Sequence, residues 1–317
     1  QQRGVLMTNF RHNFAGAGTV IADSVTVTGT VTAGALVGPL TGNTTGTHTG
    51  PVATDALTVR DVAVVAPPPN TSAELLAALA PLTSVAAWRH DRVGVASGTV
   101  ASFGNLAATL TIAGTPTVGH PQAKADGGTA RGMYFDASTT DSLSADVLDP
   151  AATSFVAGVR CALVADPGGT DHHLIGRNKA TGGVIPGWTI YVGDNGDLKY
   201  WVSDGTHIFS GTFAATTLAI GSPPIEIVAQ LDRSGADPVF RLRWSRNGAT
   251  ISSTSVTMAS LGSISTTAQE FGFGAVPAAA PSFNGGAWVQ WAWFASGTQA
   301  EGSSLAQTCS QGLGWEQ

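Results

Sequence analysis

Short stretches in which apolar and polar residues alternate fill the chain from about Trp88 onward, with turn-forming residues between them. A period of two residues is typical of a β-strand that buries one face. One pair of stretches flanks the sequence GDNGD, in which Asn195-Gly196 is a strong hairpin signal. Because such stretches recur along the region, we predict a mainly β domain, an antiparallel sandwich of two packed sheets. The clearest predicted strands are 188–192, 198–202, 225–232, 240–248 and 288–295.

A different pattern occupies residues 25–50. Valine alternates with threonine through VTVTGTVTAG, and glycine then recurs at every fourth position from Gly34 to Gly50. In an extended chain these glycines lie on one face, where another backbone can approach closely. No charged residue stands between Ser24 and Thr54, and large apolar side chains are few, so this stretch cannot build a core of its own.

We therefore predict an extended, fibrous β segment that intertwines with identical chains as a homo-oligomer, specifically a trimer. Valine and leucine would be buried between the chains, and glycine would relieve crowding at the axis. A disordered linker is the alternative interpretation. The predicted interface residues are Val27, Val31, Gly34, Leu36, Gly38, Leu40, Gly42, Gly46 and Gly50.

Two short helices are predicted outside the main strands. Within residues 55–69, the stretch ALTVRDVAVVA predicts a further short strand, and three prolines then impose an extended spacer. Thr71 and Glu74 form a capping box for a helix that Pro81 ends, and its nearly uniform apolar surface requires a covering partner. A second capping box, Thr298 with Glu301, predicts a helix through about Gln311. The predicted divisions are 1–66 for the attachment and oligomerisation segment, 67–83 for the linker and helix, and 84–317 for the sandwich.

The composition argues against several classes of function. Only 11% of residues are charged and the net charge is −6, so the chain lacks the basic footprint of a nucleic-acid-binding protein. No run of 18 apolar residues is present, and a membrane partner is therefore not expected. The opening sequence QQRGVLMTNFRHNF lacks the apolar stretch of a signal peptide. Cys161 and Cys309 are expected to be free and buried, although they could pair.

Four segments after residue 84 follow a recognisable order: AAWRHDRVGVASGTVASFGN, GMYFDASTTDSLSA, IVAQLDRSGADPVFRLRWSRNGA and FNGGAWVQWAWFASGTQAEGSSL. Together they resemble the laminin-G-like, concanavalin A-like jelly-roll domains common in phage and environmental bacterial proteins. Phe103 stands where the family pattern has a second tryptophan. The resemblance implies a concanavalin A-like antiparallel jelly roll over roughly the last 230 residues.

The glycine-spaced segment is similar to the shafts and attachment segments of phage tail fibres, which carry repeats of the kind Leu-x-Gly-x-x-x-Gly. Both resemblances together imply a virion structural protein, assembled in the host cytoplasm and displayed on a tail or capsid. The segment would bind other virion proteins, and the distal domain would adhere to host surface glycan or decorate the particle. The alternatives are an extracellular bacterial carbohydrate-binding protein and a glycan-cleaving tailspike.

Catalysis on such a fold requires carboxylates that face one sugar bond. The hydrolase signature on this fold, Glu-x-Asp-x-Glu along one strand, is absent from the sequence. The nearest acidic strand carries Glu226 and Asp232 with apolar residues between them, and Glu226 is expected to be a rim or paired residue. We therefore predict that the protein is not an enzyme.

Two groups of residues are candidates for metal binding. Asp194, Asn195 and Asp197 place oxygen ligands at calcium-like spacing, but the same sequence forms a hairpin turn without an ion, and the turn is the favoured interpretation. His172 and His173 would point to opposite faces of a strand, and a loop after Gly169 is favoured for them. No cofactor is therefore predicted, with calcium as the open alternative.

Aromatic side chains supply the candidate ligand site. One face of the hairpin strands must be core, and aromatic residues on the other face could stack on sugar rings. The candidate ligand-binding residues are Trp188, Tyr191, Tyr200 and Trp201. Trp291 and Trp293 share a face of the last strand and are expected in the core.

Overall fold

The computed structural model describes residues 58–59, 62–63, 72–90, 98–124, 128–136, 141–165, 171–177, 185–193, 196–246, 252–265, 270–274, 283–284 and 286–313. The chain divides into two compact units, Gln1–Ala66 and Pro67–Gln317. In the first unit, β1 (Thr58–Val59) and β2 (Val62–Ala63) pair antiparallel, so the single strand expected within residues 55–69 is instead a small hairpin. All nine predicted interface residues, from Val27 to Gly50, lie outside the described residues.

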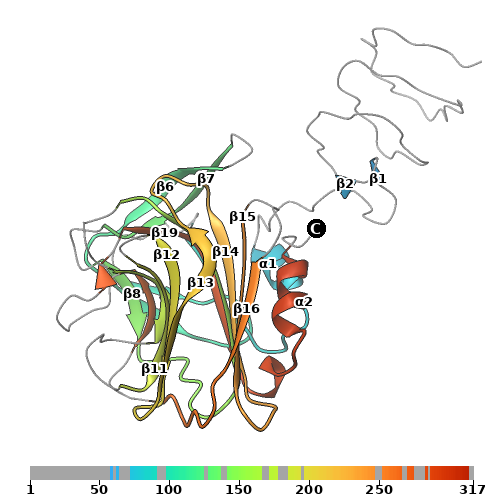
Figure 1. Cartoon of the computed structure of the whole chain (residues 1–317). Helices are drawn as coiled ribbons and strands as arrows, with labels where there is room; N and C mark the ends of the chain where they lie inside the picture. Colours follow the sequence, from blue (N-terminus) through green and yellow to red (C-terminus); the bar gives the residue numbers. More distant parts are fainter. Residues whose placement is uncertain are drawn as a thin grey trace, which may run out of the picture. The chain divides into compact units, whose positions relative to one another are not determined.

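The second unit is a β-sandwich, as the alternation predicted (Figure 1). Its described strands form a nine-stranded and an eight-stranded sheet, and every pairing is antiparallel except that of β18 with β10. The nine-stranded sheet has the order β13 (Ile208–Thr217), β12 (Asp197–Ser203), β11 (Gly187–Val192), β10 (Asp171–Arg177), β17 (Phe271–Gly274), β8 (Ser142–Ala145), β5 (Thr109–Ala113) and β4 (Gly98–Ala101), with β18 (Phe283–Asn284) beside β10. The eight-stranded sheet has the order β16 (Ser252–Thr257), β15 (Val239–Arg246), β14 (Ile225–Asp232), β9 (Phe155–Leu163), β19 (Ala287–Ser296), β7 (Thr129–Tyr134) and β6 (Thr117–Ala123), with β3 (Ala86–Arg89) beside β19.

The main core lies between the two sheets, and aromatic rings connect them. Phe155 of the eight-stranded sheet stacks on Trp188 of the nine-stranded sheet, with ring centroids 4.4 Å apart. Phe294 stacks against both rings, 5.9 Å from Phe155 and 6.4 Å from Trp188. Side chains of this size contribute a large part of the apolar area that a domain buries on folding. Cys161 lies in this core as a free thiol, as expected.

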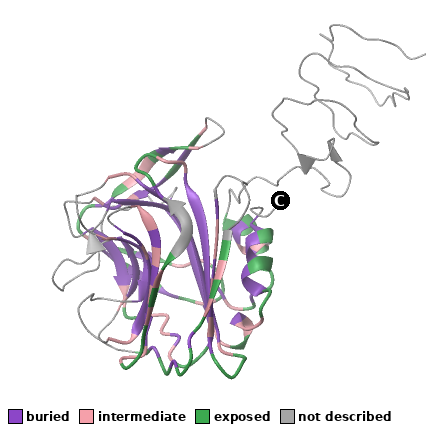
Figure 2. Ribbon diagram, in the orientation of Figure 1, coloured by how far each residue is buried: buried purple, intermediate pink, exposed green. Residues whose placement is uncertain are grey.

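A second core lies on the outer face of the eight-stranded sheet, beneath α1 (Ser72–Ala78) and α2 (Leu305–Gly312) (Figure 1). Leu75 and Leu79 of the α1 region pack there together with Trp291 and Trp293. Figure 2 shows α2 with one exposed side and one buried side. The two tryptophans are therefore buried as predicted, but between a sheet and helices rather than between the two sheets.

The second predicted capping box does not form. Residues Thr298–Ala300 form a short 3-10 helix, and α2 begins only at Leu305, after Ser304, which makes no side-chain cap. Gly302 adopts φ +106°, which a continuous helix cannot accommodate, and Glu301 instead accepts a hydrogen bond from Ser154. Thr71, the first residue of the other capping box, lies outside the described residues. None of the described helices is long and apolar enough to cross a membrane.

Candidate functional site

The predicted hairpin over β11 and β12 is present and positions all four candidate aromatic residues. Its turn is closed by the N–H of Gly196, which donates to the carbonyl oxygen of Gly193 at 2.8 Å. Gly196 has φ +80°, a conformation that glycine adopts without the penalty a side chain would impose. The strands then run antiparallel from Val192 opposite Leu198 to Gly187 opposite Ser203, which fixes the face of every side chain.

Two of the four candidate aromatic residues belong to the core. Trp188 lies opposite Val202 and stacks on Phe155, and no part of its side chain is exposed. Tyr200 lies opposite Ile190, 94% buried, with its ring 5.5 Å from that of Phe240. The expectation that these two residues could contact a ligand is therefore wrong, because the hairpin register turns both rings inward.

Tyr191 and Trp201 lie on the opposite, outward face and are partly exposed. Tyr191 is opposite Lys199, and Trp201 is opposite Thr189, so the two residues occupy diagonal positions whose Cα atoms lie about 7–8 Å apart. On the neighbouring strand, Ser210 is opposite Trp201 and Thr212 is opposite Lys199. We call this set the aromatic face: Thr189, Tyr191, Lys199, Trp201, Ser210 and Thr212.

Lys199 is the charged residue of the aromatic face as defined above. Lys199 Nζ lies 4.0 Å from Oδ1 of Asp171, a partly exposed contact that contributes little to stability. Burial, and then the negative charge of Asp171, raise the pKa of the Tyr191 phenol to about 12. The phenol therefore stays protonated at neutral pH and can donate a hydrogen bond.

Trp201 belongs to a single row of residues that crosses eight strands of the nine-stranded sheet. Directly paired positions share a face, so the register defines the row from one strand to the next. Small or hydroxyl-bearing residues occupy every position except that of the tryptophan. The row runs Ser210, Trp201, Thr189, Gly176, Gly272, Ser144, Thr111, Thr99.

Two hydroxyls on this outer face have hydrogen-bonding capacity that the described residues do not use. Thr189 Oγ1 and Ser142 Oγ are buried, and neither has a hydrogen-bond partner in the described part of the chain. Buried polar atoms are nearly always satisfied, so such atoms mark a place where a polar ligand could bind. Sequence reasoning missed both residues. Thr189 lies on the predicted hairpin, two residues from Tyr191, whereas Ser142 reaches this face only through the pairing of distant strands.

Glu226 and Asp232, the two acids considered for catalysis, each have a structural partner. Arg160 Nη1 lies 2.9 Å from Glu226 Oε1, and Arg241 Nη1 lies 2.8 Å from Asp232 Oδ2. Glu226 is thus paired, as expected, and buried rather than at the rim. The two acids lie six residues apart on β14, which corresponds to about 20 Å along a strand, whereas glycosidases hold their carboxylates about 5–10 Å apart. They cannot flank one glycosidic bond.

The metal candidates do not form a cluster within the described residues. Asp194 and Asn195 lie outside those residues, and Asp197 is the half-buried first residue of β12. His172 and His173 lie within β10, so the favoured loop interpretation is wrong for them. They pair with Val192 and Tyr191, on opposite faces of the sheet. Among the described residues, no group of three His, Cys, Asp or Glu side chains could hold a metal ion.

No protein-family model and no curated protein match the chain. Several solved structures are similar to parts of it. The enzymatically active domain of bacteriophage CBA120 tailspike protein 2 is 13% identical, with a TM-score of 0.46 over 71% of this chain and 32% of its own. The CBM40 domain of a Ruminococcus gnavus sialidase, bound to α2,6-sialyllactose, is 11% identical, with a TM-score of 0.35 over 52% of this chain and 85% of its own. At these identities and scores the resemblances carry no argument about function.

Proposed function

We propose that this chain is a non-enzymatic structural protein of a phage virion, and that it adheres to bacterial surface glycan through the aromatic face. The observation that carries the proposal is the placement of Tyr191 and Trp201 on one outward face, beside the Thr189 hydroxyl, which the described residues leave without a partner. Aromatic rings stack on the apolar faces of sugars, while hydroxyl and ammonium groups bond to sugar hydroxyls.

The chemistry of the aromatic face supports binding without cleavage. Asp171 is an acidic residue near this face, and its carboxylate lies 4.0 Å from Lys199 Nζ. The two acids of β14, Glu226 and Asp232, belong to the other sheet, and each is paired with an arginine. A face with one lysine and several hydroxyls suits a neutral or weakly acidic glycan. Adhesion of this kind needs no covalent step.

The virion assignment is supported by the sequence of residues 25–50. A trimer built on the glycine-spaced segment would carry three copies of the aromatic face on one particle component. Single aromatic platforms bind sugars weakly, and linked copies raise the overall avidity without any new contact. The fibrous segment would then raise the avidity with which the aromatic face binds glycan.

Binding of the full chain to an array of purified bacterial surface polysaccharides tests the proposal. We expect the wild type to bind at least one polysaccharide, and Trp201→Ala and Tyr191→Ala each to lower its apparent affinity about tenfold or more. Ile220→Ala is the matched control, because Ile220 is an exposed apolar residue outside the strands, with 53% of its surface accessible. Unchanged binding by both aromatic variants would contradict the site, and release of reducing sugar from a bound polysaccharide would contradict the non-enzymatic role.

A further inference from the structure

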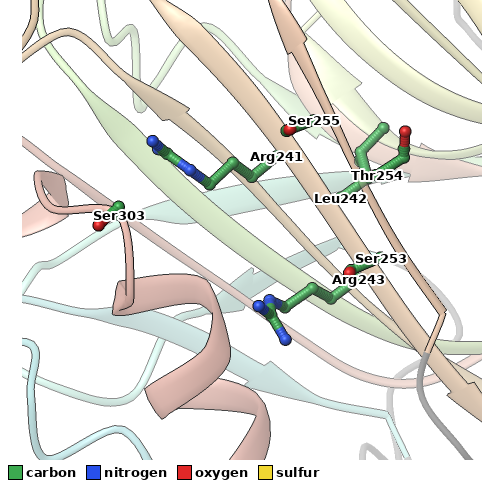
Figure 3. Close-up of a pocket in the computed structure, with 7 residues that line it drawn as sticks. All are labelled: Arg241, Leu242, Arg243, Ser253, Thr254, Ser255 and Ser303. Carbon is green, nitrogen blue, oxygen red and sulfur yellow. The ribbon is translucent and has the colours of Figure 1, made fainter.

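A small pocket lies on the outer side of the eight-stranded sheet, away from the aromatic face. It has a volume of about 210 Å³ and lies between β15, β16 and the loop that leads into α2 (Figure 3). The side chains of Arg241 and Arg243 extend from β15 towards that loop and the helix (Figure 3). The lining residues are Arg241, Leu242, Arg243, Ser253, Thr254, Ser255 and Ser303.

Arg241 supplies several hydrogen-bond donors to the pocket. A guanidinium carries five N–H donors. In the described part of the chain, the one hydrogen bond that Arg241 donates goes from Nη1 to Asp232 Oδ2 at 2.8 Å. Its side chain is only 19% exposed, so its remaining donors lie in a confined space beside the serines rather than in open solvent.

Asp232, the ion-pair partner of Arg241, is itself fixed in position. Asp232 also accepts hydrogen bonds from the backbone N–H and the hydroxyl of Ser234, and these bonds, together with Arg241, lower its pKa. The Asp232 carboxylate is therefore held in place by Ser234 and Arg241. Arg243 is the second guanidinium group that lines the pocket.

The opposite wall of the pocket is fixed in position. Gln230 Nε2 donates to the carbonyl oxygens of Ala300 and Gly302, at 2.9 Å each, and so holds the loop that carries Ser303 against β14. Ser255 lies directly opposite Arg241 in the strand pairing, and Ser253 lies opposite Arg243. Arg243 Nη2 approaches Gln307 Oε1 of α2 at 3.4 Å. The walls therefore present guanidinium and hydroxyl donors at set positions.

We propose that this pocket, the arginine pocket, binds an oxyanion: a carboxylate, sulfate or phosphate group. Planar guanidinium donors match oxyanions bidentately, and serine hydroxyls complete the shell. The volume accommodates a single such group with part of its carrier, and it is below the range of sites that enclose a whole drug-sized ligand. The anion is therefore either free in solution or a substituent of a larger saccharide. This site does not depend on the aromatic face.

Isothermal titration calorimetry of the full chain at low ionic strength tests the proposal with sodium sulfate, sodium phosphate, glucuronate and glucuronamide. We expect saturable binding of at least one anion and none of glucuronamide, which has the shape of glucuronate without its charge. Preference for glucuronate over sulfate and phosphate identifies a saccharide carboxylate, and the reverse identifies a free inorganic anion. Absence of saturable binding by all three anions overturns the proposal.

Two variants locate the site. Arg241→Gln is expected to weaken anion binding about tenfold or more. Arg241→Gln also removes a partner of Asp232, so a second variant, Ser255→Asp, is needed. Ser255→Asp places a negative charge in the pocket at an exposed position and leaves the Arg241–Asp232 pair in place. Arg131→Gln, on β7, removes an equal charge elsewhere and should leave binding unchanged. Equal anion affinity in Ser255→Asp and the wild type would overturn the assignment, as would an equal loss in Arg131→Gln.

Discussion

Arg160 Nη1 lies 2.9 Å from Oε1 of Glu226, and both side chains are more than nine-tenths buried. Ser245 Oγ donates to the other carboxylate oxygen at 3.0 Å. Burial raises the pKa of the Glu226 carboxyl to about 7, although Arg160 and Ser245 both act to lower it. The pair joins neighbouring central strands, β9 and β14, and gives the fold a pH-dependent contribution near neutrality.

The sign of that contribution follows from the pKa values. Glu226 titrates at about 7 in the folded chain and near 4.5 when unfolded, so the folded state holds more protons between these values. Its contribution to stability therefore falls as pH rises from 4.5 to 7, by roughly 3 kcal/mol. Glu226→Gln removes this dependence and leaves the Arg160 charge buried, which costs about 3–5 kcal/mol at neutral pH. Urea unfolding at several pH values measures both effects, and an unchanged pH slope in the variant would contradict the account.

Two buried histidines change the pH dependence of stability in the opposite direction to Glu226. His90 and His173 are inaccessible, and burial lowers the pKa of each imidazole from 6.5 to about 4. The unfolded chain binds these protons first, so each histidine lowers stability by roughly 3 kcal/mol as pH falls from 6.5 to 4. His90 has no hydrogen-bond partner on either ring nitrogen among the described residues, so His90→Leu should preserve stability at pH 7 within about 1–2 kcal/mol.

Thermal unfolding of His90→Leu between pH 4 and pH 7.5 measures the effect. We expect its net loss of stability in acid to be close to zero, because the loss from His173 is then offset by the gain from Glu226. Glu226→Gln should show a steeper loss than the wild type over the same range. Parallel curves for all three proteins would contradict the assignment of these groups.

The contact between Gly158 and Trp293 should be intolerant of a side chain. A Cβ added at Gly158 would lie 2.3 Å from Nε1 of Trp293, inside the core beneath the helices. Gly158→Ala should therefore lower the free energy of unfolding by about 1–3 kcal/mol. Gly235→Ala is the control, because the same Cβ there meets only the Asp237 carbonyl oxygen at 3.6 Å. Equal urea midpoints for the two variants would contradict the packing described here.

The glycine spacing predicts the oligomeric state of the chain. Light scattering should show the full chain as a trimer and residues 67–317 as a monomer. The fragment begins at Pro67 rather than Ser84 because α1 packs into the core beneath the helices. Gly38→Val and Gly42→Val should weaken the trimer if these positions approach another backbone. A folded full-length monomer, or trimers of unchanged stability in both variants, would contradict this prediction.

Local patterns predicted the hairpin but not which of its faces is buried. Asn195-Gly196 and the flanking alternation specify the turn and two sets of side chains, 188/190/192 and 189/191. Both sets contain an aromatic residue, so the sequence alone could not separate Trp188 from Tyr191. Burial is decided by Phe155 and Phe240, which come from the other sheet.

Features that depend on distant segments were not predictable. The row from Ser210 to Thr99 needs the pairing of eight strands, and the arginine pocket needs the loop before α2 to lie over β15. Similarly, the alternation in 288–295 predicted buried tryptophans, but the layer in which Trp291 and Trp293 lie is set by the helices that cover them.

Hydrogen–deuterium exchange of the full chain, with and without a polysaccharide that binds it on the array, tests the central claim most directly. The account predicts that added polysaccharide slows amide exchange in β11, β12 and β13, the strands that carry the aromatic face, and that Trp201→Ala abolishes this change. Slowed exchange confined to the eight-stranded sheet, or an unaltered response in Trp201→Ala, would contradict it.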